Sequence, residues 1–202
     1  MRKFFLSLLF VLCLTTFSHA QEQGLLIDDF EGVISGGPDG SVDFGAGGGS
    51  TVEVTAATDI KYSGKQSLKV AFDAVQGGYM WVARGYGLDA KNTAWLAKPE
   101  DIKWIDFNAF SFYVYGSDSK ANIAFDIKDN GNEMWRYMFE DNFKGWKQII
   151  CPFGEFFVRD DWQPEVADKN TNLDFPIKSF QFEPRLEAKG TLYFDTVELI
   201  KK

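Results

Sequence analysis

Three side chains in the second half of the chain have the chemistry of sugar recognition. Arg159, Asp161 and Trp162 place a forked donor, an acceptor and a flat ring within one short segment. A sugar ring offers a C–H face that stacks on an aromatic ring, and hydroxyl groups that pair with charged or amide groups. The same residues could form a surface ion pair beside a core tryptophan, so the segment alone leaves both interpretations open.

Carboxylates also lie in two apolar, strand-like runs at opposite ends of the chain. Asp29 and Glu31 belong to the run 26–32, and Asp195 belongs to the run 190–199. Burying an unpaired carboxylate costs on the order of several kcal/mol unless a cation or hydrogen-bond donors compensate it. We therefore expect the two runs to pair in one sheet, with a structural calcium ion held by the three carboxylates and by carbonyls of the turn 63–67. The alternative is that these acids are simply solvated.

The placement of histidine and cysteine excludes several catalytic chemistries. Residues 1–20 are predicted to be a secretory signal peptide, with a basic start, an apolar centre and small residues at the cleavage position. Its removal would take away His19 and Cys13 and leave Cys151 alone, which excludes a Ser-His-Asp triad, a Cys-His pair and a histidine zinc site. Cys151 lies in an apolar run and is expected to be a buried, unreactive residue.

The remaining 21–202 segment has the length of a single domain and a strongly acidic composition. Loss of the basic residues of the signal peptide would change the formal net charge from −8 to −10. Such a surface repels nucleic acid and anionic membranes, whereas neutral polymers and cations remain possible partners. No second apolar run is long enough to span a bilayer, so we expect an exported product, either secreted or periplasmic.

Apolar residues recur with a period of two along most of this segment. The pattern is typical of half-buried antiparallel strands and is clearest in the stretches 68–73, 110–115, 123–128, 135–140 and 180–183. Glycine- and asparagine-rich turns separate these stretches. The sequence therefore predicts an all-β fold, a two-sheet antiparallel β-sandwich of the jelly-roll kind.

Several segments interrupt this pattern. The stretches 35–50, 89–101 and 160–174 are predicted to be loops, the first of them mobile and the second with a helical turn around Trp95. The final strand changes parity between Phe194 and Val197, which predicts a β-bulge at Asp195-Thr196.

The order of several short motifs resembles the family 11 carbohydrate-binding modules, β-sandwich domains that bind β-glucans. The resemblance covers about residues 26–200. It rests on the motifs Ile27-Asp28-Asp29-Phe30-Glu31-Gly32-Val33, Gly78-Tyr79, Trp146-Lys147 with Ile149, Pro152 and Phe153, Arg159 with Asp161-Trp162-Gln163-Pro164, and Phe194-Asp195 with Val197 and Leu199.

The resemblance implies roles for individual residues. Tyr79 and Trp162 would be stacking platforms, and Arg159 and Asp161 would hydrogen-bond sugar hydroxyl groups. The family's structural calcium agrees with the carboxylate argument. Strand parity adds Asp126 and Lys128 as residues that line the groove, and Trp81 as an extension of the Tyr79 platform.

The chain also departs from the family pattern. The stretch 35–43 contains no aromatic residue where the family has one, a second aromatic position holds Pro184, and an acidic groove position holds Lys178. Fewer platforms imply a groove of different shape.

These observations favour an exported, non-catalytic protein that binds a polysaccharide of the β-glucan type and could serve a separate glycoside hydrolase. One alternative is a periplasmic protein-interaction role on the same framework, as in the complex-I assembly-factor family. A glycoside hydrolase is a third hypothesis, because Asp126, Asp160, Asp161 and Glu183 could supply a pair of carboxylates.

Overall fold

The structure is a computed structural model that describes residues 24–185 and 187–201. The predicted signal peptide lies outside the described residues.

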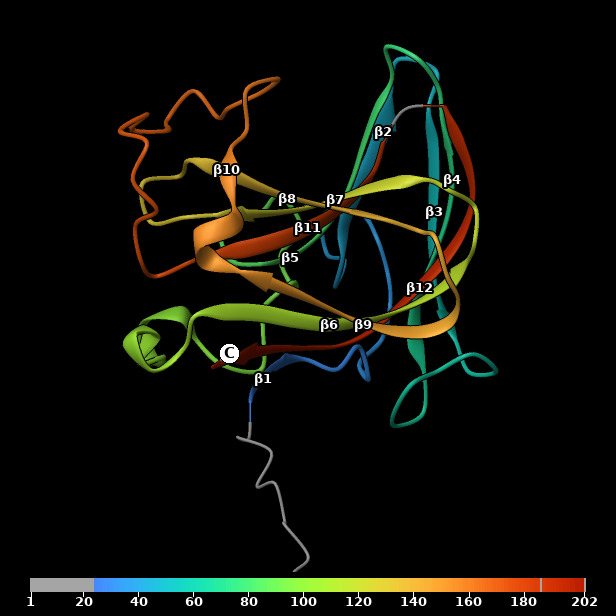
Figure 1. Cartoon of the computed structure of the whole chain (residues 1–202), viewed down its shortest axis with the longest axis horizontal. Helices are drawn as coiled ribbons and strands as arrows, with labels where there is room; N and C mark the ends of the chain where they lie inside the picture. The colour runs from blue at the N-terminus through green and yellow to red at the C-terminus, as the bar shows by residue number, and fades with distance from the viewer. Residues whose placement is uncertain (1–23, 186, 202) are drawn as a thin grey trace, which may run out of the picture.

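Two antiparallel six-stranded sheets face each other (Figure 1). Sheet A consists of β1 (Leu25–Asp28), β3 (Thr51–Ala57), β4 (Ser67–Ala74), β6 (Ala109–Ser117), β9 (Lys144–Pro152) and β12 (Ala188–Ile200). Sheet B consists of β2 (Asp43–Gly47), β5 (Tyr79–Gly85), β7 (Asn122–Lys128), β8 (Met134–Glu140), β10 (Phe157–Val158) and β11 (Ser179–Pro184). The strand orders are β3-β4-β12-β6-β9, with β1 also paired to β12, and β10-β8-β7-β11-β5-β2. The predicted β-sandwich is therefore confirmed.

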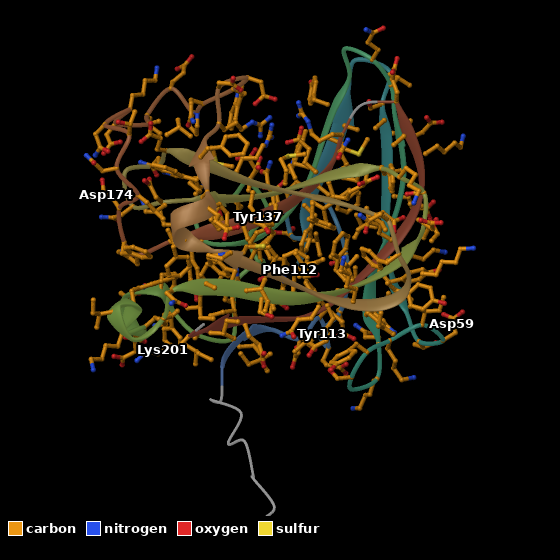
Figure 2. All side chains as sticks on the ribbon, in the orientation of Figure 1. Asp59, Phe112, Tyr113, Tyr137, Asp174 and Lys201 are labelled. Atoms are coloured by element: carbon orange, nitrogen blue, oxygen red, sulfur yellow. The ribbon has the colours of Figure 1, made fainter. Side chains whose placement is uncertain are left out.

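Phenylalanine side chains fill the space between the sheets, because the period-two pattern points every second residue of a strand inward. Phe112 of β6 lies in this space, whereas the next residue, Tyr113, lies on the outer side of sheet A (Figure 2). Phe182 of β11 and Phe194 of β12 stack across the two sheets with ring centroids 3.8 Å apart. The predicted burial of Cys151 is also confirmed, and this burial raises the pKa of its thiol well above the usual value.

The last strand joins the two ends of the chain, as the sequence predicts. Residues 188–194 of β12 pair with β4, and Leu199 pairs with Leu25 of β1. The register with β6 shifts between Asp195 and Glu198, and Thr196 has a positive φ of 52°. The predicted bulge is therefore present, and it restores Val197 and Leu199 to the core.

Three details differ from the expectations. The glycine-rich stretch 35–50 contains the edge strand β2. One face of this strand is solvated and does not need apolar residues, so glycines are tolerated there. The segment 89–101 has no helical turn at Trp95; single 3-10 turns follow instead, η1 (Pro99–Asp101) and η2 (Trp104–Asp106), with η3 (Phe153–Glu155) after β9. Strand β1 ends at Asp28, so Asp29 and Glu31 follow the strand rather than share its face.

In the described part of the chain, no helix has the length and apolar character needed to cross a membrane.

The stacked pair between the sheets gives the first prediction. Replacing Phe182 by Ala should lower the free energy of unfolding by about 3–5 kcal/mol, because a fully buried ring is lost and a cavity remains beside its partner ring on β12. Urea denaturation measures this loss. Phe157, which is 48% exposed, is the matched control, and F157A should change stability by less than 1 kcal/mol, roughly. Equal losses in the two variants would contradict this assignment of the core.

Candidate functional site

A groove of about 730 Å³ lies over the outer face of sheet B. Its lining comes from strands β5, β7, β8 and β11, from the segment 87–89 and from the segment 159–166 that follows β10. The long connection between β10 and β11, orange to red in Figure 1, closes one end of sheet B. The predicted loop 160–174 thus forms part of the groove.

The middle of the groove rests on one row of cross-strand neighbours. Gln181 of β11 lies opposite Asp126 of β7, and Asp126 lies opposite Arg136 of β8. The hairpin turn at Asp129–Asn132 fixes the second pairing, because residues equally far from a tight turn face each other. Alternation along each strand then puts all three side chains on the groove side of the sheet.

Charged side chains under the groove form a buried network. Arg136 donates to both oxygens of Asp126, at 2.7 and 2.8 Å, and to Glu183 at 2.8 Å. Arg159 forms ion pairs with Asp126 at 3.1 Å, with Glu183 at 3.1 Å and with Asp161 at 2.6 Å. Asp126 is completely buried, and both arginines and Glu183 are nearly so. Each buried charge therefore has at least two partners of opposite sign, which offsets its desolvation.

Arg185 completes the network with three arginines and three carboxylates, named here the six-charge network (Arg136, Arg159, Arg185, Asp126, Asp161, Glu183). Arg185 pairs with Glu183 and with Asp161, the latter at 3.1 Å. Gln181 adds an amide donor to Asp126 at 3.2 Å. The formal charge of this network is zero, so the base of the groove presents hydrogen-bonding groups without an excess charge of either sign.

The network sets the protonation of two of its acids. Partial burial opposes the charged form of Asp161, but the hydrogen bond from Arg159 and the charges of all three arginines lower its pKa from 3.8 to about 2. Burial raises the pKa of Glu183, and the nearby arginines oppose this change. Asp161 is therefore a permanent acceptor at the rim of the groove.

Aromatic side chains stand at both edges of the groove. Tyr79 and Trp81 project from β5 with their rings nearly parallel, at an interplanar angle of 11° and a centroid separation of 6.3 Å. Trp162 lies across the groove, 53% exposed, with the guanidinium of Arg159 5.4 Å from its ring centroid. Tyr79 is 56% exposed. Tyr79 and Trp162 remain open to solvent although the fold has a core in which to bury such rings, and Trp81 is half-buried.

The structure brings most of the predicted sugar-binding residues together. Tyr79, Trp81, Arg159, Asp161 and Trp162 all line the groove, and so does Lys128. Asp126 lies lower than predicted: it is fully buried and contacts the arginines, so it supports the groove and does not line it.

Sequence reasoning missed Arg136, Gln181 and Arg185. Arg136 shares the groove-facing parity of β8, and its distance from the Asn130-Gly131 turn equals that of Asp126, so hairpin symmetry could have identified this pair. Gln181 and Arg185 follow the outward parity of β11, but the contacts of Gln181 with Asp126 and of Arg185 with Asp161 join positions far apart in the sequence. Only the sheet order reveals their positions.

The predicted metal ligands meet the loop that connects β3 to β4. Asp195 Oδ2 accepts two backbone N–H groups of residues 62–66, at 2.8 and 3.1 Å, and Glu31 Oε1 accepts two more, at 2.7 and 3.2 Å. Asp29 Oδ1 instead accepts the N–H of Glu31 at 3.0 Å. Within residues 24–185 and 187–201, no group of three His, Cys, Asp or Glu side chains is placed to hold a metal ion. The structure thus brings Glu31 and Asp195 to one loop, whereas Asp29 contacts its own segment.

A β-sandwich with an open groove, aromatic edges and a neutral hydrogen-bonding base defines a carbohydrate-binding module. The chain belongs to the carbohydrate-binding domain family 11, whose family model matches residues 15–202. The predicted family is thereby confirmed, and the chain is a binding module and not a catalytic domain.

Related proteins share this fold along most of the chain. A family 11 carbohydrate-binding module from Clostridium thermocellum, solved in complex with a β-1,3-1,4-mixed-linked tetrasaccharide, has a TM-score of 0.65 and 25% identity, over 88% of this chain and 95% of that one. The family 11 module of the cellulosomal cellulase Lic26A-Cel5E of Clostridium thermocellum has a TM-score of 0.64 and 23% identity, over 90% and 95%.

Endoglucanase H of Acetivibrio thermocellus is 28% identical over 179 residues, which is 87% of this chain. The chain spans only 18% of the length of that relative, so the similarity covers one part of a larger protein.

The low pKa of Asp161 gives the second prediction. A carboxylate with a depressed folded-state pKa stabilises the fold above its ordinary pKa and loses this effect as the pH falls through the folded-state value. D161N should therefore have a lower free energy of unfolding than the unmodified chain, and this difference should decrease as the pH falls from about 4 to about 2. Urea denaturation across this range measures it. D160N changes the exposed neighbouring acid and is the control; a D161N deficit that stays constant with pH would contradict the assignment.

Proposed function

We propose that this chain binds a neutral β-glucan, of the mixed β-1,3-1,4-linked type, in the groove of sheet B and does not cleave it. The observation that carries the proposal is the placement of aromatic rings at both edges of a groove whose base is a neutral, hydrogen-bonding network. The mixed-linkage tetrasaccharide bound by the related family 11 module supports this choice of ligand.

The chemistry of the groove matches an uncharged sugar chain. Aromatic faces at the edges can stack on pyranose C–H faces. Between them, Arg159 and Arg185 donate, Asp161 accepts, and Gln181 can do both, so hydroxyl groups of either orientation find partners. The zero net charge of the six-charge network gives no attraction for an anionic polymer.

The alternative functions have less support. Asp126, Asp161 and Glu183, three of the four carboxylates considered for hydrolysis, are each bound to at least two arginines. A protein-interaction role would leave the convergence of aromatic and hydrogen-bonding groups in one groove without a purpose. The proposal includes export of the chain, either to the periplasm or beyond the cell. It also includes association with a separate glycoside hydrolase, and the related module of a cellulosomal cellulase supports an association with such an enzyme.

The third prediction concerns Trp162. Replacing it by Ala should lower the affinity for mixed-linkage β-glucan by about tenfold or more, because one edge of the groove loses its stacking surface. Affinity electrophoresis through gels that contain the polysaccharide measures this change. The control is Y62A, which removes an aromatic ring of similar exposure (45%) on the loop between β3 and β4, stacked on Tyr113 of sheet A, and should migrate like the unmodified chain. Equal retardation of W162A and the unmodified chain would remove Trp162 from the site.

The proposal also includes a structural calcium ion, held by two carboxylates instead of the three predicted from the sequence. Glu31 and Asp195 converge on the loop 62–66, and the charge of Glu31 contributes to the raised pKa of Asp195, whose main cause is burial. A hard divalent cation would relieve the repulsion between these two carboxylates. Backbone carbonyls and water would be its other ligands.

The fourth prediction follows from this pair. Calcium should raise the melting temperature by a few degrees relative to a chelator, because it binds the folded chain and not the unfolded one. Thermal denaturation with and without calcium measures this shift. E31Q should abolish the shift, whereas D59N, at an exposed position of the same connection, should preserve it. A melting temperature independent of calcium would show that the backbone N–H groups suffice.

A further inference from the structure

The edge strand β2 presents an unusual surface to the groove. Its groove-facing residues are Asp43, Gly45 and Gly47, and these lie opposite Ala83, Trp81 and Tyr79 of β5. The two glycines therefore face the two aromatic residues that form one edge of the groove.

These glycines are required for space and not for backbone conformation. Neither is among the glycines with a positive φ, in contrast to Gly48 and Gly49 in the turn that follows. A Cβ atom at Gly45 would lie 2.5 Å from Cη2 of Trp81, and one at Gly47 would overlap Cζ and Oη of Tyr79, whereas real Cβ atoms do not approach within 3.0 Å. Both rings thus lean across onto the bare backbone of β2.

The third groove-facing residue of β2 holds the indole in place. Oδ1 of Asp43 accepts the Nε1–H of Trp81 at 2.9 Å, and its other oxygen accepts the backbone N–H of Asp89 at 2.8 Å. The Asp43 carboxylate is therefore fixed from two sides. A hydrogen bond at one end of the indole and backbone contact at the other leave Trp81 little freedom to rotate.

We propose that Asp43, Gly45 and Gly47 are positioning residues, which set the parallel arrangement of the Tyr79 and Trp81 rings before the sugar chain binds. This inference rests on the proposed function, since it explains how one edge of the groove stacks on a β-glucan. Rings that are already fixed lose little side-chain entropy on binding, and two parallel rings on one strand can receive two sites of the same chain. The pair also offers an aromatic surface in a chain that lacks an aromatic residue in 35–43.

A purely structural role makes a different prediction. Aromatic rings that cover strand glycines also stabilise a sheet edge. If this were their only role, Gly45→Ala and Gly47→Ala would lower the melting temperature and leave the affinity of the folded protein unchanged. A positioning role requires the affinity to fall even where folding is intact.

The experiment compares G45A, G47A and D43A with G154A by isothermal titration calorimetry against a mixed-linkage β-glucan tetrasaccharide, with melting temperatures measured in parallel. A Cβ at Gly154 meets no atom within 4 Å, so G154A is the matched control. We expect G45A and G47A to lose about tenfold in affinity, D43A to lose several-fold, and G154A to be unchanged. Because Gly45 is argued to act through Trp81, G45A should have no further effect in a W81A background.

A second readout needs no ligand. The indole N–H signal of Trp81 in a ¹H–¹⁵N NMR spectrum reports the bond to Asp43, and it should shift in D43A and G45A but not in G154A. Three outcomes would overturn the inference. These are a shifted Trp81 signal with wild-type affinity in G45A and G47A, additive losses of affinity in G45A and W81A, and a Trp81 signal that does not shift in D43A or G45A.

A different outcome would refute the proposed function: the unmodified chain would bind no β-glucan. If G45A does not fold, D43A carries both measurements.

Discussion

The cost of burying charge beneath the groove is the constraint on which the rest of this molecule depends. Asp126, Arg136 and Glu183 are almost fully removed from water, and such charges are tolerated only when every one is paired. The pairing requires β7, β8 and β11 in one register and the segment after β10 folded back over them. A shift of one residue in any of these strands would expose phenylalanines and leave buried charges unpaired, so the network fixes the centre of sheet B and with it the base of the groove.

Much of this arrangement can be predicted from sequence, because alternation identifies strands and their faces. The strands around Phe112, Phe125 and Phe182 and the bulge at Asp195-Thr196 follow from that pattern, whereas the roles of Tyr79 and Trp162 follow from the resemblance to the family. Of the partners of Asp126, Arg136 could be inferred from hairpin symmetry, but Arg159 and Gln181 could not, since alternation gives a face and not a neighbour. Strand β2 escaped prediction for another reason: two of its three groove-side residues are glycines, which the rings of a different strand cover.

The same physical problem is solved differently at two of the sites where carboxylates are buried. Under the groove, guanidinium groups compensate Asp126 and Glu183, whereas backbone N–H groups of the loop 62–66 approach Glu31 and Asp195. Sequence can identify a carboxylate in an apolar run and the free energy that its burial would cost. It identifies the compensating group only where a hairpin places that group opposite, as with Arg136, because backbone donors carry no sequence signature and Arg159 lies 33 residues from Asp126 along the chain.

This division explains where the groove can vary. The central strands supply polar groups that are locked into the six-charge network, so a substitution there would leave several buried charges without partners. The aromatic residues stand at the edges, on β5 against β2 and after β10, where each ring contacts few other groups and can be lost or gained singly. The departures of this chain from its family pattern include an edge feature of this kind: an aromatic residue is missing in 35–43, and the glycines that follow make room for Trp81. A buried network at the centre therefore lets the edges change the shape of the sugar-binding surface while the fold stays the same.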